Sequence, residues 1–284
     1  MTMLVVRAGP LALLQDTGRP GLGHLGVGSS GAFDRDAMRQ VNALLGNAPG
    51  ATVIETLGGL VLRADDDHVV AVTGAAGPLR LDGRHVPHGR ALFVAAGQHL
   101  EIGSPSVGVR ACVGVAGGID ASAELGSAST DTLSGLGPAP LSAGETLHVG
   151  TADRVPDLID VPALTRSGEL TISVVLGPRH DWFTDEAVSA FLGSAWLVSP
   201  ASDRVGMRLD GPRLERAITR ELSSEPVVRG SVQVSTEGLP IVFGPDHPVT
   251  GGYPVIGVVV DAHLDRLAQA RPGQVLRFDR ARAV

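Results

Sequence analysis

The chain has 284 residues, of which 43% are hydrophobic and 19% charged, and its formal net charge is −7 at pH 7. This composition is typical of a globular protein with a sizeable core, and the acidic balance argues against nucleic acid as a partner. All 23 basic residues are arginine, which excludes a Schiff-base, P-loop or biotinylated lysine from this chain.

Cysteine usage and hydropathy indicate the compartment. Cys112 is the only cysteine, so no intramolecular disulfide can form and a reducing environment is expected. The first ten residues lack the apolar centre of a signal peptide. The longest apolar stretches, such as 254–262, have the length of a strand and are too short to span a bilayer. We therefore expect a cytoplasmic protein without membrane contact.

Short β-branched runs separated by glycine and proline dominate the chain. In chain order, the patterns predict a helix capped by Asp34, several strands, a helix capped by Thr184, two more strands and a helix capped by Asp261. The predicted helices are 34–45, 184–192 and 262–270, and the clearest strands are 69–74, 91–95, 107–115, 170–177, 239–244 and 254–260. So many strands with so few helices favour a mostly β fold, closed or sandwiched, over βαβ units.

A short repeated string suggests two related β halves. Segments 95–102, 142–149 and 271–278 each place Gly-Gln or Gly-Glu two residues before a leucine on an alternating strand. We therefore divide the chain into a β-rich N-terminal half with one helix, 1–150, and a C-terminal β-barrel half, 165–284. The Pro- and Asp-rich segment 151–169 would join them.

The string GVGSSG at 26–31 matches the G-x-G-x-x-G dinucleotide fingerprint letter for letter. That fingerprint needs an apolar strand immediately before its first glycine, whereas the preceding residues QDTGRPGLGHL form a Gly/Pro loop. The string is better explained as a tight turn that leads into a capped helix. Backbone N–H groups at this helix start would still suit an anion such as phosphate or carboxylate.

The same region carries a family resemblance that continues along nearly the whole chain. The matching stretches include LLQDTGRPGLGHLGVGSSGAFDRDAMRQVNALLGN, VAGGIDASAELGSASTDTLSGLG, GPRHDWFT, SPASDRVGMRLDG and GPDHPVTGGYPVIGVVVDAHLDRLAQARPG. With these residues the chain resembles the family known as allophanate hydrolase subunit 2 or biotin-dependent carboxyltransferase-like protein, which is also known as the C subunit of bacterial 5-oxoprolinase.

The resemblance implies a cyclophilin-like β-barrel and a partner, the subunit 1 protein, which is also called the B subunit. It also implies a lactam-hydrolase-like A subunit, ATP as a cofactor whose site the sequence does not identify, and a small amide-type substrate. We therefore expect a hydrolase subunit that takes part in ATP-dependent opening of 5-oxoproline to glutamate. Two alternatives stay open. One is carboxyl transfer to a urea- or amide-type acceptor, with biotin on a separate carrier, and the other is a non-catalytic antagonist of a kinase inhibitor.

The loop PDHPVTGGYP, 245–254, is the strongest candidate site. The resemblance carries over Asp246 and Tyr253, which we expect to transfer protons or polarise the substrate. It also carries over Thr250, Gly251 and Gly252, which we expect to bind the substrate. Val249 departs from the polar residue usual in the family. The alternative is a tight structural loop in which Tyr253 packs as a corner residue.

A second candidate cluster lies in LLQDTGR. Gln15 and Arg19 would bind a carboxylate or phosphate, and Asp16 would take part in catalysis. Alternatively, Asp16 caps the turn and pairs with Arg19. Asn42 and Glu55 match family positions and are substrate-binding candidates, although capping or loop bracing explains either.

Gln233 would face a barrel interior and is a further substrate-binding candidate. We expect the knot Ser202, Asp203 and Arg204 to be structural. The nine histidines show no metal-ligand spacing, so we expect no metal site, and Cys112 reads as an inert core residue.

Overall fold

The computed structural model describes residues 1–152, 160–165 and 168–281. Within these ranges the chain forms two compact units. Unit 1 comprises 1–19, 30–131 and 135–167, and unit 2 comprises 20–29, 132–134 and 168–284. Part of the predicted joint, 151–169, lies outside the described residues.

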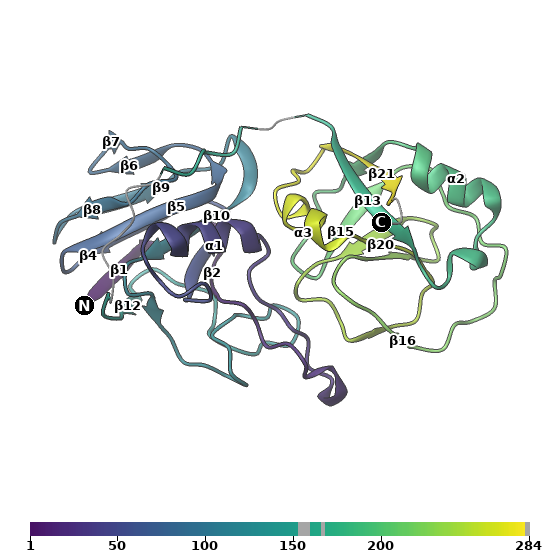
Figure 1. Cartoon of the computed structure of the whole chain (residues 1–284), viewed down its shortest axis with the longest axis horizontal. Coiled ribbons are helices and arrows are strands. Elements are labelled where there is room, and N and C mark those ends of the chain that lie inside the picture. Colours follow the sequence, from purple (N-terminus) through teal and green to yellow (C-terminus); the bar gives the residue numbers. More distant parts are fainter. Residues whose placement is uncertain (153–159, 166–167, 282–284) are drawn as a thin grey trace. The chain divides into compact units, whose positions relative to one another are not determined.

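Unit 1 is built on two antiparallel sheets (Figure 1). The larger sheet has seven strands, in the order β11 (Ile119–Asp120), β12 (Thr146–Val149), β1 (Thr2–Arg7), β4 (Leu60–Ala64), β9 (His99–Ile102), β6 (Leu79–Leu81) and β7 (Arg84–His85). The smaller has five, in the order β2 (Ala12–Gln15), β3 (Val53–Thr56), β10 (Val107–Val115), β5 (His68–Ala76) and β8 (Leu92–Val94).

One apolar core lies between the inward faces of the two sheets. It includes Met3 and Leu62 of the seven-stranded sheet with Ile54, Val72 and Val113 of the five-stranded sheet. Inward residues alternate with outward ones along β1, as expected for a strand with one buried face. The protein is thus rich in sandwiched β structure, as the sequence predicts.

The helix α1 (Arg35–Leu44) covers the five-stranded sheet. Val41 and Leu45 reach Gly114 of β10 so closely that a side chain at position 114 would contact both. The Asp34 carboxylate caps the helix by accepting a hydrogen bond of 2.8 Å from the backbone N–H of Ala37. The predicted helix over 34–45 and its cap are therefore confirmed within a residue at each end.

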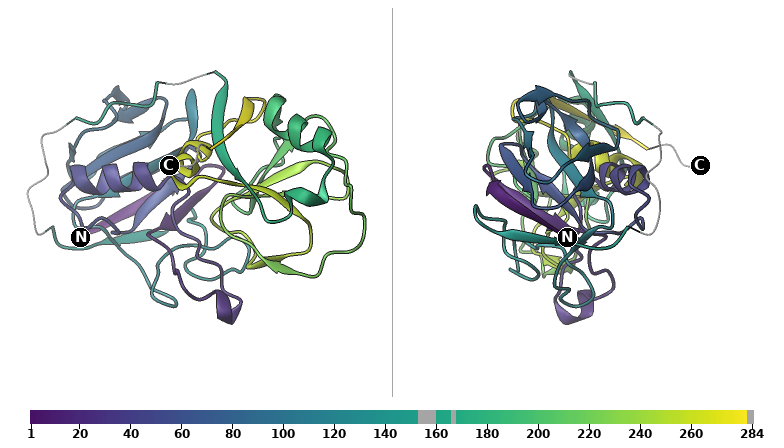
Figure 2. Two further views of the ribbon diagram at one scale, coloured as in Figure 1. Left: turned by 45° about the vertical axis from the view of Figure 1, so that its right-hand side comes forward. Right: turned by 90° about the vertical axis from the view of Figure 1, so that its left-hand side faces the viewer.

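Unit 2 is a closed seven-stranded barrel (Figures 1 and 2). Its strands follow the order β13 (Leu170–Leu176), β20 (Val255–Val259), β17 (Ser231–Val234), β18 (Pro240–Phe243), β15 (Gly206–Asp210), β14 (Trp196–Val198) and β21 (Val275–Arg280). A separate small ladder pairs β16 (Glu225–Pro226) with β19 (Thr250–Gly251). The expectation of a mostly β fold with a barrel is confirmed.

Two helices accompany the barrel, α2 (Asp185–Gly193) and α3 (Asp261–Leu267), together with short 3₁₀ turns η1 (Gly23–Leu25) and η2 (His180–Trp182). Phe191 of α2 is buried against Phe278 of β21, with ring centroids 4.6 Å apart. Thr184 caps α2 as predicted. The predicted cap of α3 is wrong, because Asp261 is the first helical residue, Val260 is the cap, and no side chain caps this helix.

Candidate functional site

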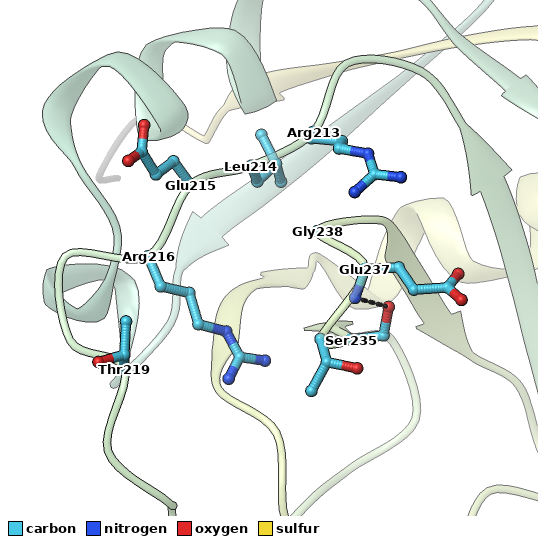
Figure 3. Close-up of a pocket in the computed structure, with 9 residues that line it drawn as sticks. Arg213, Leu214, Glu215, Arg216, Thr219, Ser235, Glu237 and Gly238 are labelled. Carbon is cyan, nitrogen blue, oxygen red and sulfur yellow. Dashed lines mark hydrogen bonds between the residues drawn. The ribbon is translucent and has the colours of Figure 1, made fainter.

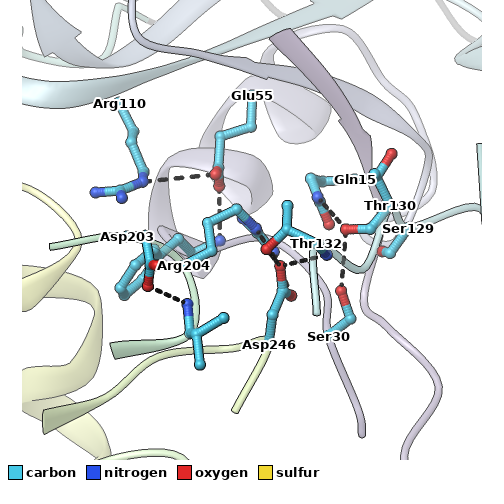
Figure 4. Close-up of polar contacts among 12 residues, drawn as sticks. Gln15, Ser30, Glu55, Arg110, Ser129, Thr130, Thr132, Asp203, Arg204 and Asp246 are labelled. Carbon is cyan, nitrogen blue, oxygen red and sulfur yellow. Dashed lines mark hydrogen bonds and ion pairs between the residues drawn. The ribbon is translucent and has the colours of Figure 1, made fainter. Parts of the chain in front are cut away.

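Gln15 lies at the end of β2, fully buried in unit 1. Its Nε2 donates a hydrogen bond of 2.9 Å to the carbonyl of Thr130. The hydroxyl of Ser30 donates to the same carbonyl, at 3.2 Å (Figure 4). The other amide atom of Gln15, Oε1, is buried and has no hydrogen-bond partner among the described residues. Gln15 therefore has a spare acceptor whose natural complement is an N–H group.

Asp16 is the anchor of the neighbouring loop. Its Oδ1 accepts hydrogen bonds from the hydroxyls of Ser127 and Ser129, both at 2.6 Å, and from the backbone N–H of Gly18 at 2.7 Å. Its Oδ2 accepts from the backbone N–H of Ala128 at 2.7 Å. All four of these hydrogen bonds come from the protein's own loops, so they hold the carboxylate in one place. The contacts of Asp16 therefore favour an anchoring role over the catalytic role expected from the sequence.

Arg19 is 2% exposed and donates to three backbone carbonyls, those of Glu124, Ser127 and Ser129. It does not pair with Asp16, so the alternative of an Asp16–Arg19 ion pair is wrong. The remaining nitrogen, Nη1, is buried without an acceptor among the described residues. A buried guanidinium held only by carbonyl dipoles is costly, and its Nη1 is an unsatisfied donor in the same loop as the unsatisfied Gln15 acceptor.

Glu55 lies on β3, and its side chain reaches the residues that precede α1. Its Oε2 accepts a hydrogen bond of 2.7 Å from the backbone N–H of Phe33, and its Oε1 lies 3.6 Å from Nε of Arg110 (Figure 4). The guanidinium of Arg110 in turn stacks over the Phe33 ring, 4.2 Å from its centroid. The expectation that this helix start could hold an external anion is therefore not supported, because the protein's own carboxylates of Glu55 and Asp34 already take these amides.

Asn42 braces the end of α1. It is fully buried, its Nδ2 donates to the carbonyl of Ala51 at 2.8 Å, and its Oδ1 accepts from Nδ2 of Asn47 at 3.2 Å. Asn47 itself accepts from the backbone N–H of Gly117. These contacts favour loop bracing over substrate binding.

In unit 2, Asp246 and Arg204 form a buried ion pair. Nε and Nη2 of Arg204 lie 2.8 and 2.9 Å from the two carboxylate oxygens of Asp246, and the side chains of Arg204 and Asp246 are 2% and 0% exposed. The hydroxyl and backbone N–H of Thr132 donate to Oδ2 of Asp246 at 2.8 and 3.0 Å (Figure 4). This two-pronged pairing fixes the position of the Asp246 carboxylate, and the Thr132 hydrogen bonds tie the Thr132 segment to it.

The TGGYP string forms an exposed ladder edge. Thr250 and Gly252 are exposed, and the Tyr253 side chain is 41% exposed. The Tyr253 ring stacks with the guanidinium of Arg216, 5.8 Å from the ring centroid, while its carbonyl accepts a hydrogen bond of 2.9 Å from Nε2 of Gln233. Tyr253 thus presents its hydroxyl from a fixed backbone, and it is not packed away as a corner residue.

Arg179 and Glu225 fasten this edge to the barrel. Nε of Arg179 donates to both carboxylate oxygens of Glu225, at 3.1 and 3.0 Å, and Glu225 pairs with Gly251 in the β16–β19 ladder. The hydrogen bond from Arg179 lowers the pKa of Glu225, and the pKa of Arg179 is raised in return. The ionised pair therefore braces the TGGYP edge at neutral pH.

Arg179, Arg216 and Glu225 were not predicted from the sequence as partners of the site, and Arg204 was expected only to be structural. Arg179 lies in GPRHDWFT and Arg204 in SPASDRVGMRLDG, so a family signal existed for both. Neither Arg216 nor Glu225 lies in a stretch that stands out in the sequence. Their roles arise from pairing across the barrel, which local pattern does not encode.

The histidine and cysteine candidates lie in buried positions. His247 is buried, with Nδ1 2.7 Å from the carbonyl of Pro248. Cys112 is buried in the core beneath α1, as the sequence predicts. Within the part of the chain that the structure describes, no three His, Cys, Asp or Glu side chains are grouped so that they could hold a metal ion. No helix among the described residues is long and apolar enough to cross a membrane.

Unit 1, a sandwich with one covering helix, carries QDTGR, and unit 2, a closed barrel, carries TGGYP, so the chain is a mostly β protein with a polar loop in each unit. Residues 25–280 match the carboxyltransferase domain, subdomain A and B. The chain belongs to this family.

Relatives support the assignment. The chain is 38% identical to the 5-oxoprolinase C subunit of Escherichia coli over 96% of its own length and 89% of that protein. It is 30% identical to urea amidolyase of Saccharomyces cerevisiae over 92% of its length, but spans only 16% of that protein. The crystal structure of the Kluyveromyces lactis urea amidolyase superposes with a TM-score of 0.91 at 27% identity, covering 98% of this chain and 18% of that one.

Proposed function

We propose that the chain is the C subunit of a 5-oxoprolinase-type assembly that opens 5-oxoproline to glutamate. The observation that carries the proposal is the match to the Escherichia coli 5-oxoprolinase C subunit, which extends over 89% of that protein at 38% identity. The urea amidolyases match at lower identity and contain the chain's equivalent as a small part of a larger protein. The partners in this proposal are a B subunit and a lactam-hydrolase-like A subunit.

Different residues of the chain are proposed to bind the substrate, to transfer a proton and to position the loops. The proposed substrate is a cyclic amide with a carboxylate, so it offers an N–H donor and an anionic acceptor. The spare Oε1 of Gln15 and the spare Nη1 of Arg19 are chemically complementary to those two groups. Tyr253, which is 41% exposed, is the proposed general acid or base. Asp246, held by Arg204, is proposed to position the Thr132 segment.

The remaining candidates fall into two groups. Thr250 and Gly252 are proposed to contact the substrate at the exposed edge, because both are exposed to solvent. Asp16, Asn42, Glu55, Gln233 and Gly251 are proposed to hold the loops in place.

In this proposal ATP is a substrate of the whole assembly, and no ATP site is assigned to the loop before α1. The glycine-rich loop before α1 does not fit its phosphates, since the N–H of Phe33 is bonded to Glu55 and the N–H of Ala32 to the carbonyl of Asp16. The chain also contains no lysine. We therefore assign no step of nucleotide chemistry to this loop.

The cytoplasm is the proposed location. A single cysteine cannot form an intramolecular disulfide, which fits that reducing compartment.

The test is glutamate release from 5-oxoproline by the full chain mixed with its candidate partner subunits, with and without ATP. Release that requires both ATP and this chain is the expected result. The test variants are Arg19→Gln and Gln15→Leu, each of which should release little glutamate in a mixture whose folding and assembly are checked in the same way. No release from partners shown by gel filtration to be folded and bound would overturn the proposal.

Carboxyl transfer is the second candidate, because the urea amidolyases and a putative urea carboxylase of Emericella nidulans also match. Biotin would then have to sit on another polypeptide, since this chain has no lysine to carry it. Carboxylation of urea by the chain in the presence of a separate biotinylated carrier, without glutamate release from 5-oxoproline, would favour this candidate.

A further inference from the structure

A hollow of about 590 Å³ opens on unit 2 between the segments 213–219 and 235–238 (Figure 3). None of the residues assigned to the proposed reaction lines it. Its floor is partly apolar, through the buried Leu214, and its walls carry two arginines and three hydroxyl groups. Its lining thus has the polar groups of a binding site as well as the space.

Arg216 is a pre-positioned donor in this hollow. Its Nη2 donates a hydrogen bond of 2.7 Å to the carbonyl of Val234, and its guanidinium stacks over Tyr253. These two contacts hold the planar group in one orientation and leave its other N–H groups without a partner among the described residues. Figure 3 shows the guanidinium directed across the hollow toward the 235–238 segment. Little side-chain entropy would be lost when such a group binds a ligand.

Arg213 supplies a second positive charge from the opposite end of the same segment. It is exposed, and within the described ranges it makes no hydrogen bond or ion pair. It belongs to the lining of the hollow, and in Figure 3 its side chain extends along the rim above the 237–238 backbone. Arg213 and Arg216 thus bring two permanently charged donors to the lining of the hollow.

The neutral lining is rich in donors. Thr219, Ser235 and Thr236 bring hydroxyl groups to the hollow. The Ser235 hydroxyl accepts a hydrogen bond of 3.3 Å from the backbone N–H of Glu237, so its own proton is free to be donated. The carboxylates of Glu215 and Glu237 also belong to the lining, but Figure 3 shows them turned outward on opposite sides, away from Arg216.

From this arrangement we infer that the hollow binds the oxyanion group of a small ligand, a phosphate or a carboxylate, between Arg213 and Arg216. Each guanidinium presents paired N–H donors that match two oxygens of such a group, and the hydroxyls complete the shell. Phosphates and carboxylates can both accept hydrogen bonds in this way, so the experiment must use probes of both kinds.

The experiment is isothermal titration of the full chain with pyrophosphate, ADP and L-glutamate. At least one probe should bind, and Arg213→Gln and Arg216→Gln should each weaken its binding about tenfold or more. Tighter binding of pyrophosphate and ADP would identify a phosphate ligand, and tighter binding of glutamate a carboxylate ligand. Arg208→Gln is the control, because Arg208 is exposed on β15 of the same barrel and does not line the hollow.

Two results would overturn the inference. One is the absence of binding of all three probes at millimolar concentration, and the other is binding that is unchanged in both arginine variants. Since Arg216 also contacts Val234 and Tyr253, its replacement could disturb the fold locally. Arg213 has no such contacts, so its variant alone decides the question if the Arg216 variant is unstable.

Discussion

The Gln233 side chain occupies the space that a side chain at position 251 would need. A Cβ atom added to Gly251 would lie closer to Nε2 of Gln233 than any real Cβ contact allows. The same Nε2 holds the carbonyl of Tyr253. Packing against the Gln233 amide therefore explains a glycine at position 251 without a ligand.

Gly251→Ala should displace the Gln233 amide and break its bond to Tyr253. We expect the free energy of unfolding to fall by about 1 kcal/mol or more, the value of a lost buried hydrogen bond. Gly252→Ala is the matched control, because a Cβ there would have only the carbonyl of Leu222 nearby, at 3.9 Å. Urea denaturation of the two variants checks the prediction, and equal stability would contradict it.

Removal of one partner of the buried Asp246–Arg204 pair should strongly destabilise unit 2. Asp246→Asn keeps the shape of the side chain but leaves the buried guanidinium without its counter-ion, so we expect a loss of about 3–5 kcal/mol in the free energy of unfolding. The control is Asp65→Asn, which breaks the exposed Arg63–Asp65 pair and should cost less than about 1 kcal/mol.

The Asp246→Asn variant also separates the two roles of this carboxylate. A positioning role predicts that stability and activity fall together, with the pH profile of the remaining activity unchanged. Proton transfer by Asp246 predicts instead that one limb of the pH profile disappears.

Local sequence signals predicted much of the fold but little of the pairing within the sites. The helix α1 was predictable because Asp34, the apolar stripe and Gly46-Asn47 all lie within a few neighbouring residues. The partners of Asp246 are not local, because Arg204 lies 42 positions away in the sequence. Glu225 and Arg179 meet across 46 positions, and only the closed barrel brings them together. The predicted cap of α3 was wrong for a different, local reason. The helix begins one residue earlier than predicted, so Asp261 lies in its first turn and Val260 takes the cap position.

Tyr253→Phe isolates the chemistry of one hydroxyl group. The phenylalanine ring keeps the stacking with Arg216, and the backbone bond to Gln233 is unaffected. If the hydroxyl is the general acid or base, turnover in the reconstituted assembly should fall roughly 100-fold or more. A change of less than about twofold in a variant with normal stability would remove Tyr253 from the mechanism.

The Arg179–Glu225 pair gives the TGGYP edge a defined pH response. Folding lowers the pKa of Glu225 through the hydrogen bond from Arg179, so the ionised carboxylate is favoured in the folded state. The resulting stabilisation is fully present above the pKa of an unfolded glutamate, about 4.3, and is lost as the pH falls through the lower folded value.

Glu225→Gln removes this response. We expect the variant to be less stable than the parent at neutral pH, and the difference in the free energy of unfolding to shrink as the solution is acidified below the unfolded pKa. Glu221→Gln is the control, because Glu221 is exposed and has no hydrogen bond or ion pair among the described residues. Its difference from the parent should be small at every pH. A Glu225→Gln difference that stays constant on acidification would show that the ion pair does not brace this edge.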